Sequence, residues 1–274
     1  MDLKNTFTKT SMTGLALMQA SLLSATTATA NTQNEVSVSA QDREGIYENS
    51  YDASYVRYLD LVSSDSGAYL INPYLQRVSS LSGGYSRTGD SDTLNMGGTF
   101  YFNDQWSIAA EGAYSELDNS YGEQQYKFFK ALVGYNFSPE WQVGAGFQYA
   151  KAEFDLDFGG NVLEGEFSNT SPIAFTRYTT VGKTGTGWDL MLELIGNDVD
   201  TYTGSARYFF SPGLSVAGTF EYVNSPSGFD NDKRAGIEVD YWFNEQFSVT
   251  AGYEKNTDSD ADDDVATLSA SYRF

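Results

Sequence analysis

The last seven residues, Leu268-Ser-Ala-Ser-Tyr-Arg-Phe274, alternate between two kinds of side chain. In an extended strand, successive side chains point to opposite faces. One face would carry the apolar members of the stretch: Leu268, Ala270, Tyr272 and Phe274. The other face would carry the polar members: Ser269, Ser271 and Arg273. Because chain termini are usually loose and polar, this pattern predicts a two-faced strand that is held in a sheet.

The composition of the 274-residue chain excludes several classes of function. It has 37 acidic and 16 basic residues and a net charge of −21, which is the opposite of the basic footprint that nucleic-acid binding requires. Cysteine is absent, so disulfides and thiolate metal sites are excluded. Histidine is also absent, and with it the usual general base at neutral pH and the commonest metal ligand. We therefore expect no nucleic-acid partner and no cofactor.

Residues 1–30 have the three parts of a secretory signal peptide. Lys4 and Lys9 precede an apolar stretch at 14–23, and small residues then end in Ala28-Thr29-Ala30, an A-x-A cleavage pattern. A membrane-spanning helix would need about 20 apolar residues, more than this stretch provides. The sequence therefore predicts a cleaved signal and export from the cytoplasm.

Four short stretches resemble one another and mark a repeated turn. They are YFNDQWSI at 101–108, YNFSPEWQV at 135–143, YFFSPGLSV at 208–216 and YWFNEQFSV at 241–249. Each has an aromatic cluster, a few residues suited to a tight turn, and the start of a new alternating run. This repetition predicts a series of antiparallel hairpins.

Aromatic residues cluster at the ends of these alternating runs, with small or aliphatic residues between them. The run at 141–150 shows the pattern on one face: Trp141, Val143, Ala145, Phe147 and Tyr149. Soluble sandwiches also alternate, so the period alone does not identify the fold. Aromatics at both strand ends are typical of the two girdles that bound the apolar band of a membrane barrel.

Counting back from Phe274 gives twelve strands, an even number as bacterial barrels of this kind require. Their ranges are 265–274, 247–256, 232–243, 213–224, 202–211, 188–197, 168–182, 141–154, 124–138, 105–115, 93–102 and 76–86. The predicted fold is an all-β, antiparallel, up-and-down transmembrane barrel over residues 76–274. Residues 31–75 do not fit this scheme and are expected to form an N-terminal periplasmic or plug-like segment. Short strands at 36–40 and 55–62 are the alternative, and a further spanning pair there would make fourteen.

The connections between the predicted strands differ in length in a regular way. Short ones are at 103–104, 139–140, 183–187, 212 and 244–246, whereas longer ones are at 116–123, 155–167, 225–231 and 257–264. The connection at 198–201 is a short exception among the longer ones. Barrels of this kind have short periplasmic turns and longer external loops. The pattern therefore predicts that both termini lie on the periplasmic side.

With its signal peptide, aromatic-flanked turns and final Tyr272-Arg273-Phe274, the chain resembles the porin-like outer-membrane proteins of Gram-negative bacteria. The resemblance covers residues from about 76 to 274 and implies a location in the outer membrane, in contact with lipid and lipopolysaccharide. It also implies that the final strand acts as a signal for the barrel-assembly machinery, through Leu268, Ala270, Tyr272 and Phe274. Nothing in the sequence singles out a transported solute or an oligomeric state.

Charged residues on the inward parity of the strands are the candidate pore-lining residues. They are Glu111, Lys130, Asp189, Glu193, Arg207, Glu221, Arg234, Glu238, Asp240, Glu254 and Arg273. If water surrounds them, they line a channel for passive diffusion of ions or small hydrophilic solutes, and the acidic excess favours cations. If the arginines pair across the lumen, the barrel is closed. The alternative function is then a non-conducting structural or surface-interaction barrel.

Enzymatic chemistry finds little support in the sequence. Outer-membrane hydrolases generally place a histidine in their sites, and this chain has none. Glu238 and Asp240 share a face, but such a pair is more often part of a wet wall than a catalytic site. The loop at 258–264 offers Asp258, Asp260 and Asp262 as weak metal ligands, yet it lacks the glycine and the distal glutamate of an EF-hand. We interpret it as a solvated external loop and expect no metal.

Overall fold

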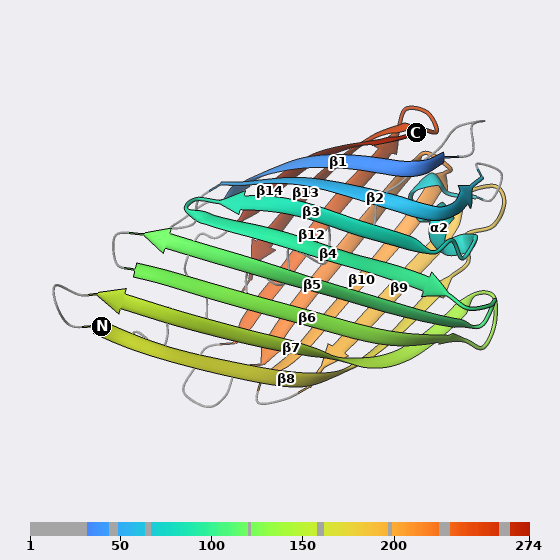
Figure 1. The fold of residues 1–274 in the computed structure, drawn as a ribbon. Coiled ribbons are helices and arrows are strands. Elements are labelled where there is room, and N and C mark those ends of the chain that lie inside the picture. Colours follow the sequence, from blue (N-terminus) through green and yellow to red (C-terminus); the bar gives the residue numbers. More distant parts are fainter. Residues whose placement is uncertain are drawn as a thin grey trace.

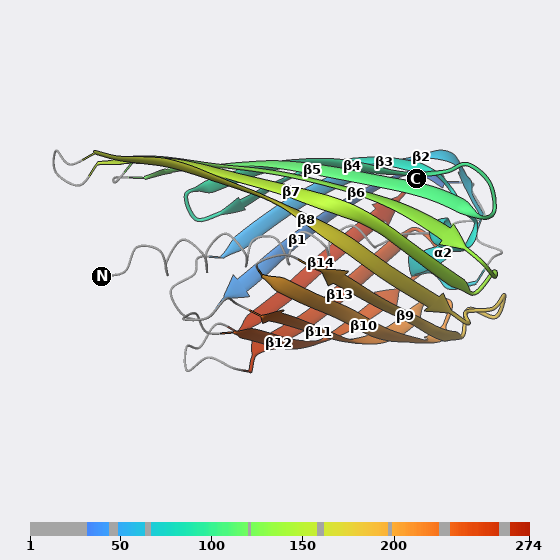
Figure 2. The same cartoon turned by 90° about the horizontal axis from the view of Figure 1, so that it is seen from below.

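The computed structural model describes residues 32–43, 49–63, 67–119, 122–157, 162–196, 199–224, 231–257 and 264–274. They form a closed barrel of fourteen strands in which each strand pairs antiparallel with its neighbours (Figures 1 and 2). The first seven strands are β1 (Thr32–Arg43), β2 (Ser50–Val62), β3 (Ser80–Thr88), β4 (Ser91–Tyr101), β5 (Trp106–Asn119), β6 (Gly122–Asn136) and β7 (Trp141–Asp157). The other seven are β8 (Val162–Thr179), β9 (Gly187–Ile195), β10 (Asp200–Ser211), β11 (Leu214–Asn224), β12 (Asp232–Trp242), β13 (Phe247–Asn256) and β14 (Val265–Arg273).

The final strand closes the barrel by pairing with β1, side by side with it in Figure 1. Val36 lies opposite Tyr272, and the pairing continues at Phe274, whose amide donates to the carbonyl of Asn34 at 2.9 Å. On the inner side of this seam, the buried guanidinium of Arg273 donates to the equally buried carboxylate of Glu35. The hydroxyl of Tyr58 donates to the same carboxylate at 2.9 Å. Backbone pairing and a buried ion pair therefore both hold the ends of the sheet together.

Twelve was too few strands, and fourteen, the alternative, is the number in the structure. All twelve predicted strands are present, and the additional pair is β1 and β2. Most of residues 32–62 therefore belongs to the barrel wall, not to a separate N-terminal segment. The sequence signal was weak because the outward face of β1 carries only small or aliphatic side chains around Val36 and Val38, with no aromatic girdle.

Two of the expected external loops are largely strand. Residues 116–119 and 122–123 continue β5 and β6, and residues 155–157 and 162–167 continue β7 and β8. Their polar, acidic composition suggested loops, but alternating residues in strands that extend beyond an apolar band are polar as well. These two hairpins are therefore longer than predicted.

The outer face of the barrel is apolar and bears aromatic rings at the end where the short turns lie. Neighbouring strands contribute ring pairs there, including Trp106 with Tyr135, at 4.7 Å between ring centroids, and Trp188 with Tyr208, at 4.9 Å. We call this end the turn end, because it carries the connections 102–105, 137–140, 212–213 and 243–246, and the opposite end the loop end. Phe274 lies at the turn end (Figures 1 and 2). The expected turn-end girdle is thus present in the described residues.

Residues 67–78, the mouth segment, connect β2 to β3 at the turn end and fold into the barrel. They include the 3-10 helix η2 (Tyr69–Ile71) and the single-turn helix α2 (Asn72–Leu75), drawn beside the C-terminus in Figure 1. Leu70 and Ile71 are buried and pack in one cluster with Phe209 of β10. None of the helices in the described part of the chain is long or apolar enough to cross a membrane.

Candidate functional site

The structure places all eleven candidate residues on the inner face of the barrel. Cross-strand partners share a face, and several candidates are partners of one another, such as Glu111 with Lys130 and Glu221 with Arg234. The neighbouring outward positions carry exposed apolar side chains, for example Phe129 and Phe220. The inward parity of these residues therefore agrees with the register, but their environments divide into two kinds.

One part of the interior, the filled half, is packed with side chains from β5 to β9. Lys130 on β6 donates to both carboxylate oxygens of Glu193 on β9, at 2.8 and 2.9 Å, and each side chain is only 8% exposed. Phe128 and Ile173 are also buried there on the inner face. This charged pair spans the two intervening strands β7 and β8 and is almost fully buried amid apolar side chains.

Glycines on β7 explain why this half is filled. The ring of Phe175 lies over Gly144, so closely that a Cβ at Gly144 would stand 2.2 Å from the ring. Leu132 approaches Gly146 in the same way, at 2.8 Å from a Cβ placed there. Without side chains of its own at these positions, β7 lets the side chains of β6 and β8 lie flat against the wall. Ile173 and Phe175, which share the inner face of β8 with Arg177, are part of this packing.

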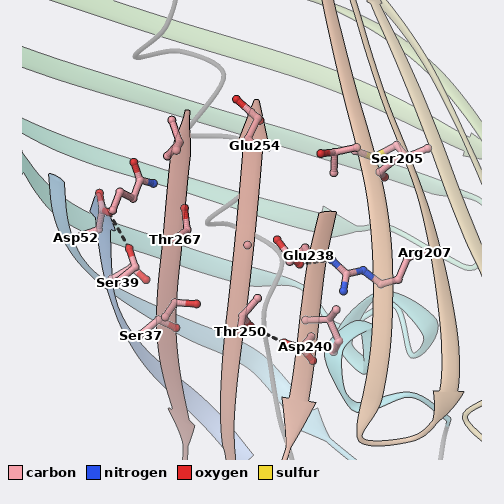
Figure 3. A pocket seen from close by; sticks show the side chains of 18 of the residues that line it. Ser37, Ser39, Asp52, Ser205, Arg207, Glu238, Asp240, Thr250, Glu254 and Thr267 are labelled. Atoms are coloured by element: carbon pink, nitrogen blue, oxygen red, sulfur yellow. Dashed lines mark hydrogen bonds and ion pairs between the residues drawn. The ribbon is translucent and has the colours of Figure 1, made fainter. Parts of the chain in front are cut away.

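The rest of the interior contains a cavity of about 290 Å³, bounded by β1–β4 and β8–β14 (Figure 3). Six of the eleven candidates line it: Asp189, Arg207, Glu221, Glu238, Asp240 and Glu254. The other five do not: Glu111, Lys130, Glu193, Arg234 and Arg273. We call this part the cavity half. The structure thus brings six predicted residues around one space and places the other five in buried interactions or in the filled half.

Hydrogen bonds fix several of the charged side chains at the cavity wall. Arg207 contacts Glu238 as an ion pair and donates to the hydroxyl of Ser215 at 2.8 Å. The hydroxyl of Thr250 donates to Asp240 at 2.6 Å, as Figure 3 shows. Arg177 forms a two-pronged ion pair with Asp189, with both distances 2.9 Å. The cavity therefore presents charges whose positions are set by neighbours on adjacent strands.

Most of the uncharged polar lining was missed by sequence reasoning. It consists largely of hydroxyl side chains: Ser37, Ser39, Ser54, Ser82, Thr203, Ser205, Thr219, Thr250, Thr267 and Ser269. Those on β1 and β2 were missed because residues 31–75 were left out of the barrel. The others, with Ser269 among them, lie on the polar parity of predicted strands, but only charged residues were predicted to line the pore. The serines that alternate with valine at 36–39 are the signal that would have found the first group.

The mouth segment forms the floor of the cavity at the turn end, through Leu70 and Ile71. Three contacts fix it to the inner wall. The amide of Tyr69 donates to the carbonyl of Pro212 at 2.9 Å, and the Tyr69 ring meets Trp242 edge-on. On the other side, the guanidinium of Arg177 lies 3.6 Å from the centre of the Tyr74 ring, a cation–π contact. The segment thus crosses the mouth from β12 to β8.

No group of three acidic side chains in the described part of the chain is arranged to hold a metal ion. The weak metal candidates Asp258, Asp260 and Asp262 lie outside the described residues. Glu238 and Asp240 lie on one face as predicted, but Glu238 pairs with Arg207 and Asp240 accepts from Thr250. Their arrangement is that of a polar wall held by neighbouring side chains.

Comparisons with known proteins support this architecture. No family model and no curated protein sequence matches the chain. Among solved structures, the outer membrane protein Omp33 of Acinetobacter baumannii is similar, with a TM-score of 0.65 and 20% identity over 89% of this chain and 98% of that one. The CymD monoaromatic hydrocarbon channel and the Pseudomonas putida toluene transporter TodX have TM-scores of 0.56 and 0.52, each with 10% identity over 90% of both chains. The chain therefore has the fold of outer-membrane β-barrels.

Proposed function

We propose that this protein is an outer-membrane channel for passive diffusion of ions or small hydrophilic solutes. The observation that carries the proposal is the polar cavity inside a closed, outwardly apolar barrel. Burying unpaired polar side chains inside a protein is unfavourable, so hydroxyls and carboxylates around an internal space favour a water-filled one. The neighbours described as an outer membrane protein, a channel and a transporter support the same class of function.

In this proposal the turn end faces the periplasm and the loop end faces the exterior. Short turns and both ends of the barrel sheet lie at the turn end, which is the periplasmic arrangement in bacterial barrels. Residues 1–30 act as the cleaved signal, and the terminal strand with Leu268, Ala270, Tyr272 and Phe274 on its outer face is read by the barrel-assembly machinery. Lipid and lipopolysaccharide surround the barrel.

The channel prefers cations. Among the described residues that line the cavity, six carry carboxylates and two carry guanidinium groups. The carboxylates are Asp52, Asp189, Glu221, Glu238, Asp240 and Glu254, and the cations are Arg177 and Arg207. Such an excess inside a low-dielectric wall raises the local concentration of cations and lowers that of anions.

Two observations favour a second candidate, a non-conducting structural or surface-interaction barrel. The filled half leaves only part of the interior accessible, and the mouth segment closes the floor of the cavity through Leu70 and Ile71. In this case the extracellular connections would carry the function, by contacting other molecules at the cell surface. The two candidates differ in whether a path from the cavity reaches the periplasm.

Planar-bilayer recording of the purified, refolded protein tests the proposal. We expect discrete conductance steps and, under a salt gradient, a reversal potential of the sign for cation selectivity. Added neutral polyols of graded size should reduce the conductance only while they are small enough to enter. Protein that is folded, as judged by heat-modifiable gel migration, but that gives no steps would exclude the channel and leave the second candidate.

A further inference from the structure

The cavity wall contains hydroxyl groups that form no hydrogen bond with the described part of the chain. Thr203, Ser205 and Thr219 on β10 and β11 line the cavity, and none of them forms a hydrogen bond within the described part of the chain. The same holds for a second group on β2, β3 and β14: Ser54, Ser82, Thr267 and Ser269. Each hydroxyl can donate once and accept twice. The wall therefore offers many hydrogen-bonding positions to whatever occupies the cavity.

Ser54 and Ser82 of the second group, on β2 and β3, lie across the space from the first group on β10 and β11. In the ring of fourteen strands, β3 and β10 are separated by half of the circumference. Figure 3 shows Ser205 on one side and Ser39 and Asp52 on the other, with the cavity between them. A solute in the cavity can therefore be bound by hydroxyl groups from two opposite sides. This arrangement suits a molecule that carries hydroxyl groups on several sides.

Glu221 differs from the other carboxylates of the wall. Asp189 and Glu238 form ion pairs with arginines, Glu254 pairs with Arg234 at 3.4 Å, and Asp240 accepts from Thr250. Asp52 accepts from Ser39 at 2.7 Å. For Glu221, no hydrogen bond or ion pair to another described residue occurs. It is the carboxylate that remains available to a charged ligand.

The surroundings of Glu221 form an acceptor patch with space beside it. Thr203 is its cross-strand partner on β10, and Thr219 precedes it by two residues on the same face of β11. Gly236 on β12 lies next to Thr219, where a Cβ would come within 2.6 Å of the Thr219 hydroxyl. Glycine at this position therefore keeps the patch accessible from the cavity.

We propose that the cavity is a binding site for a small solute that carries both a protonated amine and several hydroxyl groups. The amine binds at Glu221, with the hydroxyls of Thr203 and Thr219 as further acceptors, because an ammonium group has three donors. The solute's hydroxyls bind to Ser54, Ser82, Thr267 and Ser269. A volume of about 290 Å³ is near the lower end of the range for small-molecule sites, which fits a monomer-sized solute. This inference rests on the proposed channel function and names its solute class.

Block of the ion current by three probes tests the inference in planar bilayers at about pH 7, below the ordinary pKa of an amine. Glucosamine has the amine and the hydroxyls, glucose has only the hydroxyls, and cyclohexylammonium has only the charge. We expect glucosamine to block at a concentration about tenfold lower than either of the other two, because glucose lacks the charge-assisted hydrogen bond to Glu221 and cyclohexylammonium lacks the hydrogen bonds of the hydroxyls. Equal block by glucosamine and glucose would overturn the inference.

Two variants and one control assign the effect to the site. Glu221→Gln should raise the half-blocking concentration of glucosamine about tenfold and leave that of glucose unchanged. Ser54→Ala combined with Ser82→Ala should weaken the block by both sugars. Glu111→Gln removes the same charge from the inner face of the filled half, outside the cavity lining, and should change neither.

The outcomes separate this inference from the function on which it rests. Conductance steps in the wild type with no preference for glucosamine would leave the channel intact and exclude the solute class. An effect of Glu221→Gln no larger than that of Glu111→Gln would exclude Glu221 as the binding group. The absence of steps in folded wild-type protein would exclude the channel and this inference with it.

Discussion

The filled half and the cavity half of the interior have the same inward parity and the same kinds of charged residue, yet they differ in what their charges contact. Lys130 and Glu193 form an ion pair across the two intervening strands β7 and β8 and are almost fully buried. Arg207 and Glu238 also form a pair, but their side chains are 14% and 27% exposed at the cavity wall. Inward-facing charges in a barrel can therefore be buried packing elements or solvent-facing elements.

Glycine neighbours account for much of this difference. Gly144 and Gly146 of β7 lie beneath side chains from adjacent strands and so allow the filled half to pack. Gly252 of β13 also lies on the inner face, but a Cβ there would have no neighbour nearer than 3.8 Å. One set of glycines is covered by protein and the other is exposed to the cavity. The residues around a glycine, and not the glycine itself, therefore decide whether the wall is filled.

Removal of one charge from each half should give the largest contrast. Lys130→Met leaves Glu193 buried without its lysine and should lower the free energy of unfolding by about 3–5 kcal/mol. Arg207→Met removes the partner of a more exposed carboxylate and should cost only about 1 kcal/mol. Urea-dependent folding into detergent micelles or lipid vesicles measures both values.

The double variant Lys130→Met/Glu193→Leu provides the control, since it removes both charges and keeps comparable volume. It should recover most of the loss, as isosteric apolar replacements of buried pairs often do. Equal costs for Lys130→Met and Arg207→Met would contradict the division of the interior into two environments.

Replacement of residues 69–75 by a flexible Gly-Ser sequence of the same length should have the next largest effect. It removes Leu70 and Ile71 from the cavity floor and the Tyr74 ring from Arg177. If the channel runs through the cavity half, single-channel conductance should rise several-fold because the narrowest part of the path is widened. Tyr74→Phe keeps the ring over Arg177 and should leave the conductance unchanged. A replaced segment with wild-type conductance would show that the path does not pass this floor.

Most of the barrel could be predicted from the sequence, because aromatic residues mark the strand ends and each predicted strand buries a polar face inside. The alternation ending at Phe274 predicted the strand that closes the barrel against β1. Strand β1 itself was not assigned to the wall, since serine and valine alternate there without aromatics. A strand is recognised from its sequence only when the side chains on its two faces differ clearly in polarity and size.

The sequence could not predict which candidate residues line the cavity. Strand parity shows that a side chain faces the interior, but it does not show which side chains lie opposite it. Contacts such as Lys130 with Glu193 join residues 63 positions apart and depend on how sharply the wall curves. The floor at Leu70 and Ile71 depends on a connection that folds inward, and connection length alone does not give its direction. Sequence spacing therefore identified the inner face, whereas three-dimensional packing selected which of its residues surround the cavity.

Neutralisation of two carboxylates in the cavity half should have a moderate effect on selectivity. Glu238→Gln combined with Asp240→Asn removes two of the six negative charges of the lining and should lower the cation-to-anion permeability ratio by a factor of about two. The reversal potential under a salt gradient measures the ratio. Glu111→Gln is the control, since it removes one charge from the filled half and leaves the buried pair of Lys130 and Glu193 intact. If that control shifts the reversal potential by as much per charge removed, the permeating cations do not distinguish the cavity half from the filled half.

A steric probe at Gly252 should give the smallest effect and sharpen the location of the path. Gly252→Phe places a ring on the inner face of β13, where the nearest atoms around a Cβ, at 3.8–4.0 Å, belong to Ile237, Thr267 and Glu238. The ring has room to enter the cavity, so the barrel should fold and the conductance should fall by about a third as the cross-section narrows.

Gly218→Phe is the matched control on the outer face of β11, where a Cβ has no described neighbour within 4 Å. Its cross-strand partner is Ile237, an exposed apolar residue, so the added ring lies among lipid-facing side chains and should leave the conductance unchanged. The two variants add the same volume to the inner and the outer face of the barrel wall. A difference in conductance between them therefore reports only the narrowing of the cavity. Equal conductances for the two variants would mean that ions cross the barrel along another route, because a ring of this size narrows any path through a space of about 290 Å³.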